Sequence, residues 1–239
     1  MARQQQDVDE LFDVRNAYYV GNFQQAINEA QSIKPSTPLV ALQRDAFLYR
    51  SYIAQGNYRI VQQELKNADP MLQPLQSLVD YLSPGANKPA IVADIDARVA
   101  KGTELANEIF IIVAAMIYYH EDNYEAALKI LHGVSGLEAR ALSLQCLLAM
   151  ARPDLARKQL LLMQELEDDA TLTQLAQAWL NLSQVRINIV ATLQVASRYI
   201  AQLLDSHPDH PFSKEYHAKS NELRRLAGQY QASVQTSTV

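Results

Sequence analysis

The hydrophobic pattern of residues 103–131 predicts two helices joined by a tight turn. A continuous apolar run at 109–119 ends at the polar residues 121–123. After this interruption, apolar or small side chains return at the three- and four-residue spacing of one helix face. Small residues at Ala115 and Ala127 would let the two helices cross closely, as in the tetratricopeptide repeat of about 34 residues. The segment is therefore predicted to form one complete helical hairpin.

The same turn recurs towards the amino terminus, each time as a glycine followed by an asparagine. Asn22 and Asn57 lie 35 residues apart, and Asn123 follows Asn57 by 66 residues, close to two repeat periods. Asp154 occupies the matching position 31 residues further on. Such spacing is typical of a repeat protein, in which each hairpin buries its apolar face against its neighbours. The predicted fold class is therefore all-α, a tetratricopeptide-like solenoid of helical hairpins that winds as a right-handed superhelix.

Proline, glycine and polar breaks divide the remainder of the chain into further predicted helices. The junction after Leu182 has no turn signal, because neither proline nor glycine occurs near it. A partner helix is therefore missing or merged at this point. The expected helix ranges are 11–20, 22–33, 39–54, 57–67, 71–82, 91–99, 137–150, 155–165, 171–182, 187–204 and 213–230.

The composition indicates a folded helical protein without affinity for nucleic acid. Hydrophobic residues make up 49% of the chain, whereas it holds only 7 glycines and 9 prolines, the residues that many strand turns would need. The net charge of −5 provides no basic surface for a phosphate backbone or an anionic membrane. The apolar run at 109–119 is too short to span a bilayer, and the amino terminus lacks the apolar core of a secretory signal. Neither nucleic acid binding nor direct membrane insertion is expected.

Candidate chemistry in the sequence is sparse. Cys146 lies in an apolar helical run and, as the single cysteine, is predicted to be a buried core residue. His207, His210 and His217 surround a proline break, but their spacing is not that of a zinc site, so we interpret them as loop histidines. The sequence contains no HExxH, GxSxG or phosphate-binding glycine motif. We therefore expect no enzyme activity, no cofactor and no metal.

The first helix of each tetratricopeptide hairpin lines the concave surface of the stack, which predicts a partner-binding groove. A site for a peptide carboxylate would need several converging lysines or arginines, and only Arg50 is present. The groove instead suits a folded or extended partner segment, because it is largely apolar and aromatic. The predicted groove residues are Phe12, Asn16, Tyr19, Arg50, Ile53, Met116, Tyr119, Leu147 and Met150.

Four stretches carry a resemblance to a known family: residues 9–31, 44–54, 155–182 and 197–216, of which ATLTQLAQAW at 170–179 is the most specific. They resemble the epsilon subunit of coatomer, the COPI vesicle coat, and their amino-acid sequence is most similar to that of plant members. The resemblance implies a noncatalytic, cytoplasmic coat subunit, peripheral on Golgi membranes and COPI vesicles, that acts in Golgi-to-ER retrograde and intra-Golgi transport. It also implies that the chain binds and stabilises the carboxy-terminal region of the coatomer alpha subunit.

The chain departs from the family pattern after Leu182. Family members continue there with a partner helix and another hairpin, so we expect an internal deletion of roughly 50 residues near 183–187. The expected domains are a flexible amino terminus at 1–7, a solenoid at 8–230 and a flexible tail at 231–239. The alternative function, from a different class, is a stand-alone tetratricopeptide adaptor that binds peptide motifs of other proteins.

Overall fold

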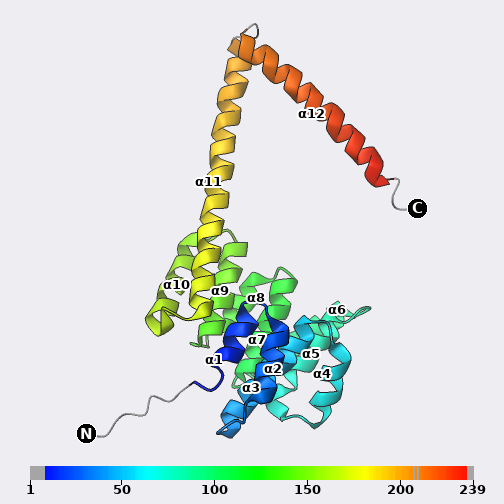
Figure 1. Ribbon diagram of the computed structural model, residues 1–239, viewed down its shortest axis with the longest axis vertical. Coiled ribbons are helices and arrows are strands. Elements are labelled where there is room, and N and C mark those ends of the chain that lie inside the picture. The colour runs from blue at the N-terminus through cyan, green and yellow to red at the C-terminus, as the bar shows by residue number, and fades with distance from the viewer. Residues whose placement is uncertain (1–8, 207, 209, 236–239) are drawn as a thin grey trace. The chain divides into compact units, whose positions relative to one another are not determined.

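The computed structural model describes residues 9–206, 208 and 210–235 (Figure 1). All regular elements in these ranges are helices, so the prediction of an all-α helical solenoid is confirmed. The chain divides into two compact units, Met1–Ser183 and Gln184–Val239. Residues 1–7, predicted to be a flexible amino terminus, and residues 236–239 of the predicted tail lie outside the described residues. Residues 231–235 continue the last helix.

Helices of the first unit follow one another as antiparallel hairpins, with two short 3-10 helices, η1 (Leu65–Asn67) and η2 (Pro70–Leu72), between the second and third. After five hairpins, helix α11 (Thr171–Ser206) begins in the first unit and continues into the second unit. The second unit also holds α12 (Pro211–Gln235). The five hairpins are α1 (Phe12–Tyr19) with α2 (Phe23–Ser32), α3 (Pro38–Ala54) with α4 (Tyr58–Glu64), α5 (Pro74–Leu82) with α6 (Lys88–Lys101), α7 (Glu108–His120) with α8 (Tyr124–Leu131), and α9 (Leu137–Ala149) with α10 (Pro153–Glu167).

Every one of these hairpins turns through a residue in the left-handed backbone region. Glycine occupies this position in the first three turns, where the lack of a Cβ removes the steric penalty. Asp122 and Ala151, both with φ of 57°, occupy it in the last two. The residue that caps the second helix follows directly, or after one more residue in the third turn. The residues at these N-cap positions are Asn22, Asn57, Asn87, Asn123 and Arg152, and the side chains of Asn22, Asn87 and Asn123 accept a capping hydrogen bond.

Two of these caps revise the repeat spacing. Between Asn57 and Asn123 the sequence predicts a further turn at Ser83 to Lys88, and Asn87 is the cap within it: its side chain accepts a hydrogen bond from the backbone N–H of Ala90 at 3.4 Å. The match of Asp154 to Asn123 is wrong, because Arg152 occupies the N-cap position of the helix there, without a side-chain capping bond, and Asp154 already lies in the first turn. The equivalence was hidden because this turn has neither glycine nor asparagine.

Replacing Ala151 with glycine is expected to stabilise the protein by about 0.5–1 kcal/mol. The left-handed conformation costs an ordinary L-residue about 1–2 kcal/mol, and the extra freedom of glycine in the unfolded chain offsets only part of that gain. Asp122→Gly is the matched comparison and should gain less, since aspartate tolerates this region and the Asp122 carboxylate accepts a hydrogen bond from the Tyr124 hydroxyl at 2.5 Å. Urea unfolding of both variants measures the difference, and a loss of stability in Ala151→Gly would contradict the argument.

The core of the first unit is centred on α7. Phe110 and Ile117 of this helix are fully buried, and Ala115 and Ala127 are fully buried as well, as the close crossing of α7 and α8 requires. A second cluster joins α9, α10 and the start of α11, with Trp179 packed against it. Cys146 is buried in the first cluster, which confirms its predicted core position, and burial raises the pKa of its thiol to about 11.

Helix α11 is continuous where the sequence predicted two helices, at 171–182 and 187–204. Nothing between them interrupts the backbone hydrogen bonds, because the segment lacks proline and glycine. The division between the two compact units falls at Ser183, within this helix. The predicted deletion near 183–187 stays a prediction.

Candidate partner-binding groove

A cavity of about 510 Å³ lies in the first unit among the first helices of its hairpins. Its lining comes from α1, α3, α7 and α9, from Asp9, from Met71 of η2, from Ala106 and Asn107, and from Glu167 and residues 169–172 where α10 ends and α11 begins. Helices that are distant in sequence therefore meet at one site. This is the arrangement expected of the inner surface of a stack of helical hairpins.

Four of the nine predicted groove residues line this cavity: Phe12, Asn16, Tyr19 and Arg50. Phe12 is 60% exposed, whereas the Arg50 side chain is only 10% exposed. The other five predicted residues lie elsewhere in the first unit. Ile53 and Leu147 are buried in the core, Met116 and Tyr119 are half-buried against it, and Met150 is exposed after the end of α9.

An ion pair crosses from α3 to α9 beside the cavity. The Arg50 guanidinium donates two hydrogen bonds to the Glu138 carboxylate, one of them at 3.1 Å between Nη1 and Oε2. Its Cζ also lies 4.8 Å from the centre of the Tyr18 ring and 5.4 Å from that of Phe47. Burial alone would lower the pKa of Arg50, but the Glu138 carboxylate raises it above its usual value, so the guanidinium stays charged. The only cation predicted for the groove is therefore already neutralised.

A second contact joins the first and last helices of the unit. The Thr171 hydroxyl at the start of α11 donates a hydrogen bond to the Asn16 side-chain oxygen of α1 at 2.6 Å, across 155 residues of sequence. Tyr19 of α1 packs against the clusters at both ends of the stack. Burial raises the pKa of the Tyr19 phenol, so this ring remains neutral in its packed position.

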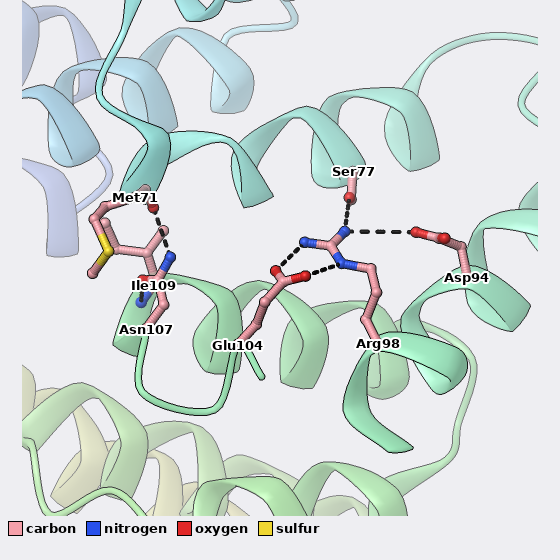
Figure 2. A network of polar contacts seen from close by, with 7 residues as sticks. All are labelled: Met71, Ser77, Asp94, Arg98, Glu104, Asn107 and Ile109. Carbon is pink, nitrogen blue, oxygen red and sulfur yellow. Dashed lines mark hydrogen bonds and ion pairs between the residues drawn. The ribbon is translucent and has the colours of Figure 1, made fainter. Parts of the chain in front are cut away.

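The start of α7, which lines the cavity, is held by two sets of polar contacts shown in Figure 2. Asn107 caps α7 by accepting a hydrogen bond from the backbone N–H of Ile109 at 3.0 Å, and its amide donates to the Met71 carbonyl at 2.9 Å. Beside it, Arg98 binds both oxygens of Glu104, at 2.9 and 2.5 Å, and the Ser77 hydroxyl at 3.0 Å. These contacts tie η2 and α6 to residues 104–107, which lead into α7, and so hold one side of the cavity.

Asn107→Ala is expected to destabilise the first unit by about 1–2 kcal/mol, because it removes both the helix cap and the bond to the Met71 carbonyl. Asn107→Asp keeps the oxygen that caps the helix but loses the amide donor, so it should cost less. Circular dichroism during urea unfolding measures both values. Equal losses in the two variants would show that the cap contributes nothing.

Sequence reasoning missed several residues of this site. Leu39 and Met71 line the cavity although they lie outside the helix positions from which the groove was predicted. Glu138 was missed because its partner lies 88 residues away, and a lone acidic residue in a first helical turn usually serves only the helix dipole. The crossing of α3 and α9 is what gives Glu138 its role.

Within the described residues, no group of three His, Cys, Asp or Glu side chains is placed to hold a metal ion. Of the three histidines considered above, His207 lies outside the described residues. No helix among those described is both long and apolar enough to cross a bilayer.

A stack of helical hairpins around a cavity defines the protein class as a helical-repeat protein. Residues 7–193 match the family described as coatomer epsilon subunit, and the chain belongs to that family. The resemblance drawn from residues 9–31, 44–54 and 155–182 is thereby confirmed.

Curated relatives extend this result across distant organisms. A coatomer subunit epsilon-2 of Arabidopsis thaliana is 39% identical over 176 residues, covering 73% of this chain and 60% of the relative. A coatomer subunit epsilon of Dictyostelium discoideum is 35% identical over 206 residues, covering 80% and 68%. One of Caenorhabditis elegans is 33% identical over 174 residues, covering 71% and 59%. The chain thus spans about 60% of the length of the plant and nematode relatives.

Proposed function

We propose that this chain is a noncatalytic structural subunit of the COPI coatomer, which binds and stabilises the carboxy-terminal region of the alpha subunit in Golgi-to-ER retrograde and intra-Golgi vesicle transport. The observation that carries the proposal is the match of residues 7–193 to the coatomer epsilon subunit family. We propose that the chain is located at the cytoplasmic face of Golgi membranes and COPI vesicles, with which it associates as part of the coat.

The cavity among the first helices supports binding of a polypeptide partner. Its exposed apolar side chains, such as Phe12, offer surface that a partner would bury, and a few such anchors commonly carry most of the binding free energy. We propose Phe12, Asn16, Tyr19 and Arg50 as the part of the groove nearest the bound segment. The remaining five predicted residues would extend or support that surface.

The first experiment is co-purification of this chain with the carboxy-terminal region of the alpha subunit, beside a chain carrying the repeats that we expect to be absent near 183–187. We expect both forms to bind, because the cavity lies entirely within the first unit. Binding by the restored form alone would assign recognition to the absent repeats. Binding by neither form would refute the proposal.

A point variant tests whether the cavity is the contact surface. Phe12→Asp is expected to weaken binding of the alpha region by about tenfold or more, since it places a charge among the apolar anchors. Leu161→Asp is the matched control, because Leu161 is similarly exposed, at 54%, on α10 away from the cavity. Calorimetric titration of both variants gives the comparison. Equal effects of the two variants would exclude the cavity as the binding site.

The adaptor alternative differs in what it requires from the partner. An adaptor should bind free short peptides as tightly as the proteins that contain them. A coat subunit should gain most of its affinity from a larger folded surface. Comparing the affinity of the whole alpha region with that of peptides cut from it separates the two.

A further inference from the structure

Three large apolar side chains of the cavity are exposed to water. Phe12, Leu39 and Met71 line the cavity and are 60%, 63% and 41% exposed. Ile112 and Val113 of α7 supply buried apolar lining. Large apolar side chains gathered at a concave site mark a binding surface, because each gains free energy when a partner excludes water from it.

The charges around this apolar surface are predominantly negative. Five carboxylates and two guanidinium groups line the cavity. Both guanidinium groups are already paired, Arg15 with Asp9 and Arg50 with Glu138. The carboxylates of Glu108, Glu167 and Asp169 have no ion-pair partner within the described residues. We call these three residues the acidic rim.

The helix at the edge of the cavity strengthens this negative field. Glu167 lies in the last turn of α10, where the helix dipole is negative, and that turn holds no basic residue to balance it. The segment that carries Glu167 and Asp169 is held in place by side chains of α11. Thr173 donates to the Glu167 carbonyl and Gln174 to the Asp168 carbonyl, each at 2.8 Å. The backbone of this segment is therefore held in place before any partner arrives, which lowers the entropic cost of binding.

We propose that the cavity binds a polypeptide segment in which apolar side chains are flanked by lysine or arginine. The apolar side chains pack among Phe12, Leu39 and Met71, and the flanking cations reach the acidic rim. A segment flanked by acidic residues is rejected, since its carboxylates would face the rim at close range. This inference rests on the proposed function, because it gives the chemistry of the alpha-subunit segment that the groove holds.

Two synthetic peptides with the same Phe-Leu pair test this chemistry, one flanked on each side by two lysines and the other by two glutamates. Each is titrated into the full chain with NMR detection at low salt. A short peptide covers little surface, so the ratio of affinities is the readout. We expect the lysine peptide to bind about tenfold more tightly and this preference to shrink as salt is added.

The combined variant Glu108→Gln, Glu167→Gln and Asp169→Asn is expected to remove the preference. The matched control is Glu64→Gln, Glu125→Gln and Asp205→Asn, which changes the net charge equally at exposed positions outside the cavity. The control should keep the preference. Absence of binding by both peptides, equal affinities, preference for the glutamate peptide, or a preference that survives in the rim variant would each overturn the inference.

Titration of the same variants with the alpha region distinguishes the two proposals. If the alpha region does not bind the unmodified chain while the peptide preference holds, the proposed function fails and the cavity chemistry stands. If the alpha region binds the unmodified chain and the rim variant equally, and the peptides are not distinguished, the chemistry fails and the proposed function stands.

Discussion

Replacing Glu138 with glutamine is expected to lower the free energy of unfolding by about 3 kcal/mol. The change leaves the Arg50 guanidinium charged and nearly buried without a carboxylate, and breaking a buried ion pair from one side typically costs about 3–5 kcal/mol. We expect the lower end of this range, because the Glu138 side chain is itself 25% exposed and water screens part of the interaction. The fluorescence of Trp179, the single tryptophan, reports unfolding of the cluster at the start of α11.

The reverse replacement separates pairing from burial. Arg50→Met should cost less than Glu138→Gln, because the Glu138 left behind is more exposed and can be hydrated. The double variant Arg50→Met, Glu138→Met should recover much of the loss, since an apolar pair of similar volume removes both desolvation costs. A loss of stability in the double variant equal to or larger than the sum of the two single losses would show that the two charges do not stabilise each other, and would contradict this argument.

Replacing Phe110 with alanine is expected to cost about 3–5 kcal/mol, the range for deleting a buried aromatic side chain and leaving a cavity. Phe110 has no exposed surface in α7, and the Arg98 guanidinium lies 4.7 Å from the centre of its ring. The loss therefore removes core packing and the cation–π contact together. Circular dichroism during urea unfolding measures the change.

Phe110→Leu is the matched variant and should cost about 1–2 kcal/mol, because most of the apolar volume remains while the ring face is lost. Neighbouring residues of the same helix line the groove, so Phe110→Ala should also weaken binding of the alpha region, whereas Phe110→Leu should leave it nearly unchanged. A Phe110→Ala variant as stable as the unmodified chain would contradict the central place of α7 in the core.

The hairpins could be read from the sequence because their signals are local. Helical periodicity placed α7 and α8, and glycine-asparagine pairs marked the first two turns. The break between residues 150 and 155 was also predicted, but the left-handed conformation of Ala151 was not, because alanine does not itself favour that backbone region. The continuous α11 also follows from local chemistry, since the chain there supplies nothing that would end a helix.

The groove could be predicted only in part. Positions on single first helices were sufficient to select Phe12, Asn16, Tyr19 and Arg50. Contacts between hairpins that are distant in sequence could not be predicted, because the hydrophobic pattern along the chain carries no signal for a pair such as Arg50 and Glu138. Ile53 and Leu147 lie on first helices, as predicted, but neighbouring helices bury them in the core, which the linear pattern does not indicate.

The hydrogen bond between Asn16 and Thr171 changes how the first unit should unfold. In an open stack, where each repeat touches only its neighbours, the terminal hairpins fray independently and the middle outlasts them. Here α1 is also tied to α11, so opening the first hairpin exposes surface at the far end of the stack. Backbone amides of α1 should therefore exchange with solvent at rates close to those of α9, and the unit should lose structure in one cooperative step.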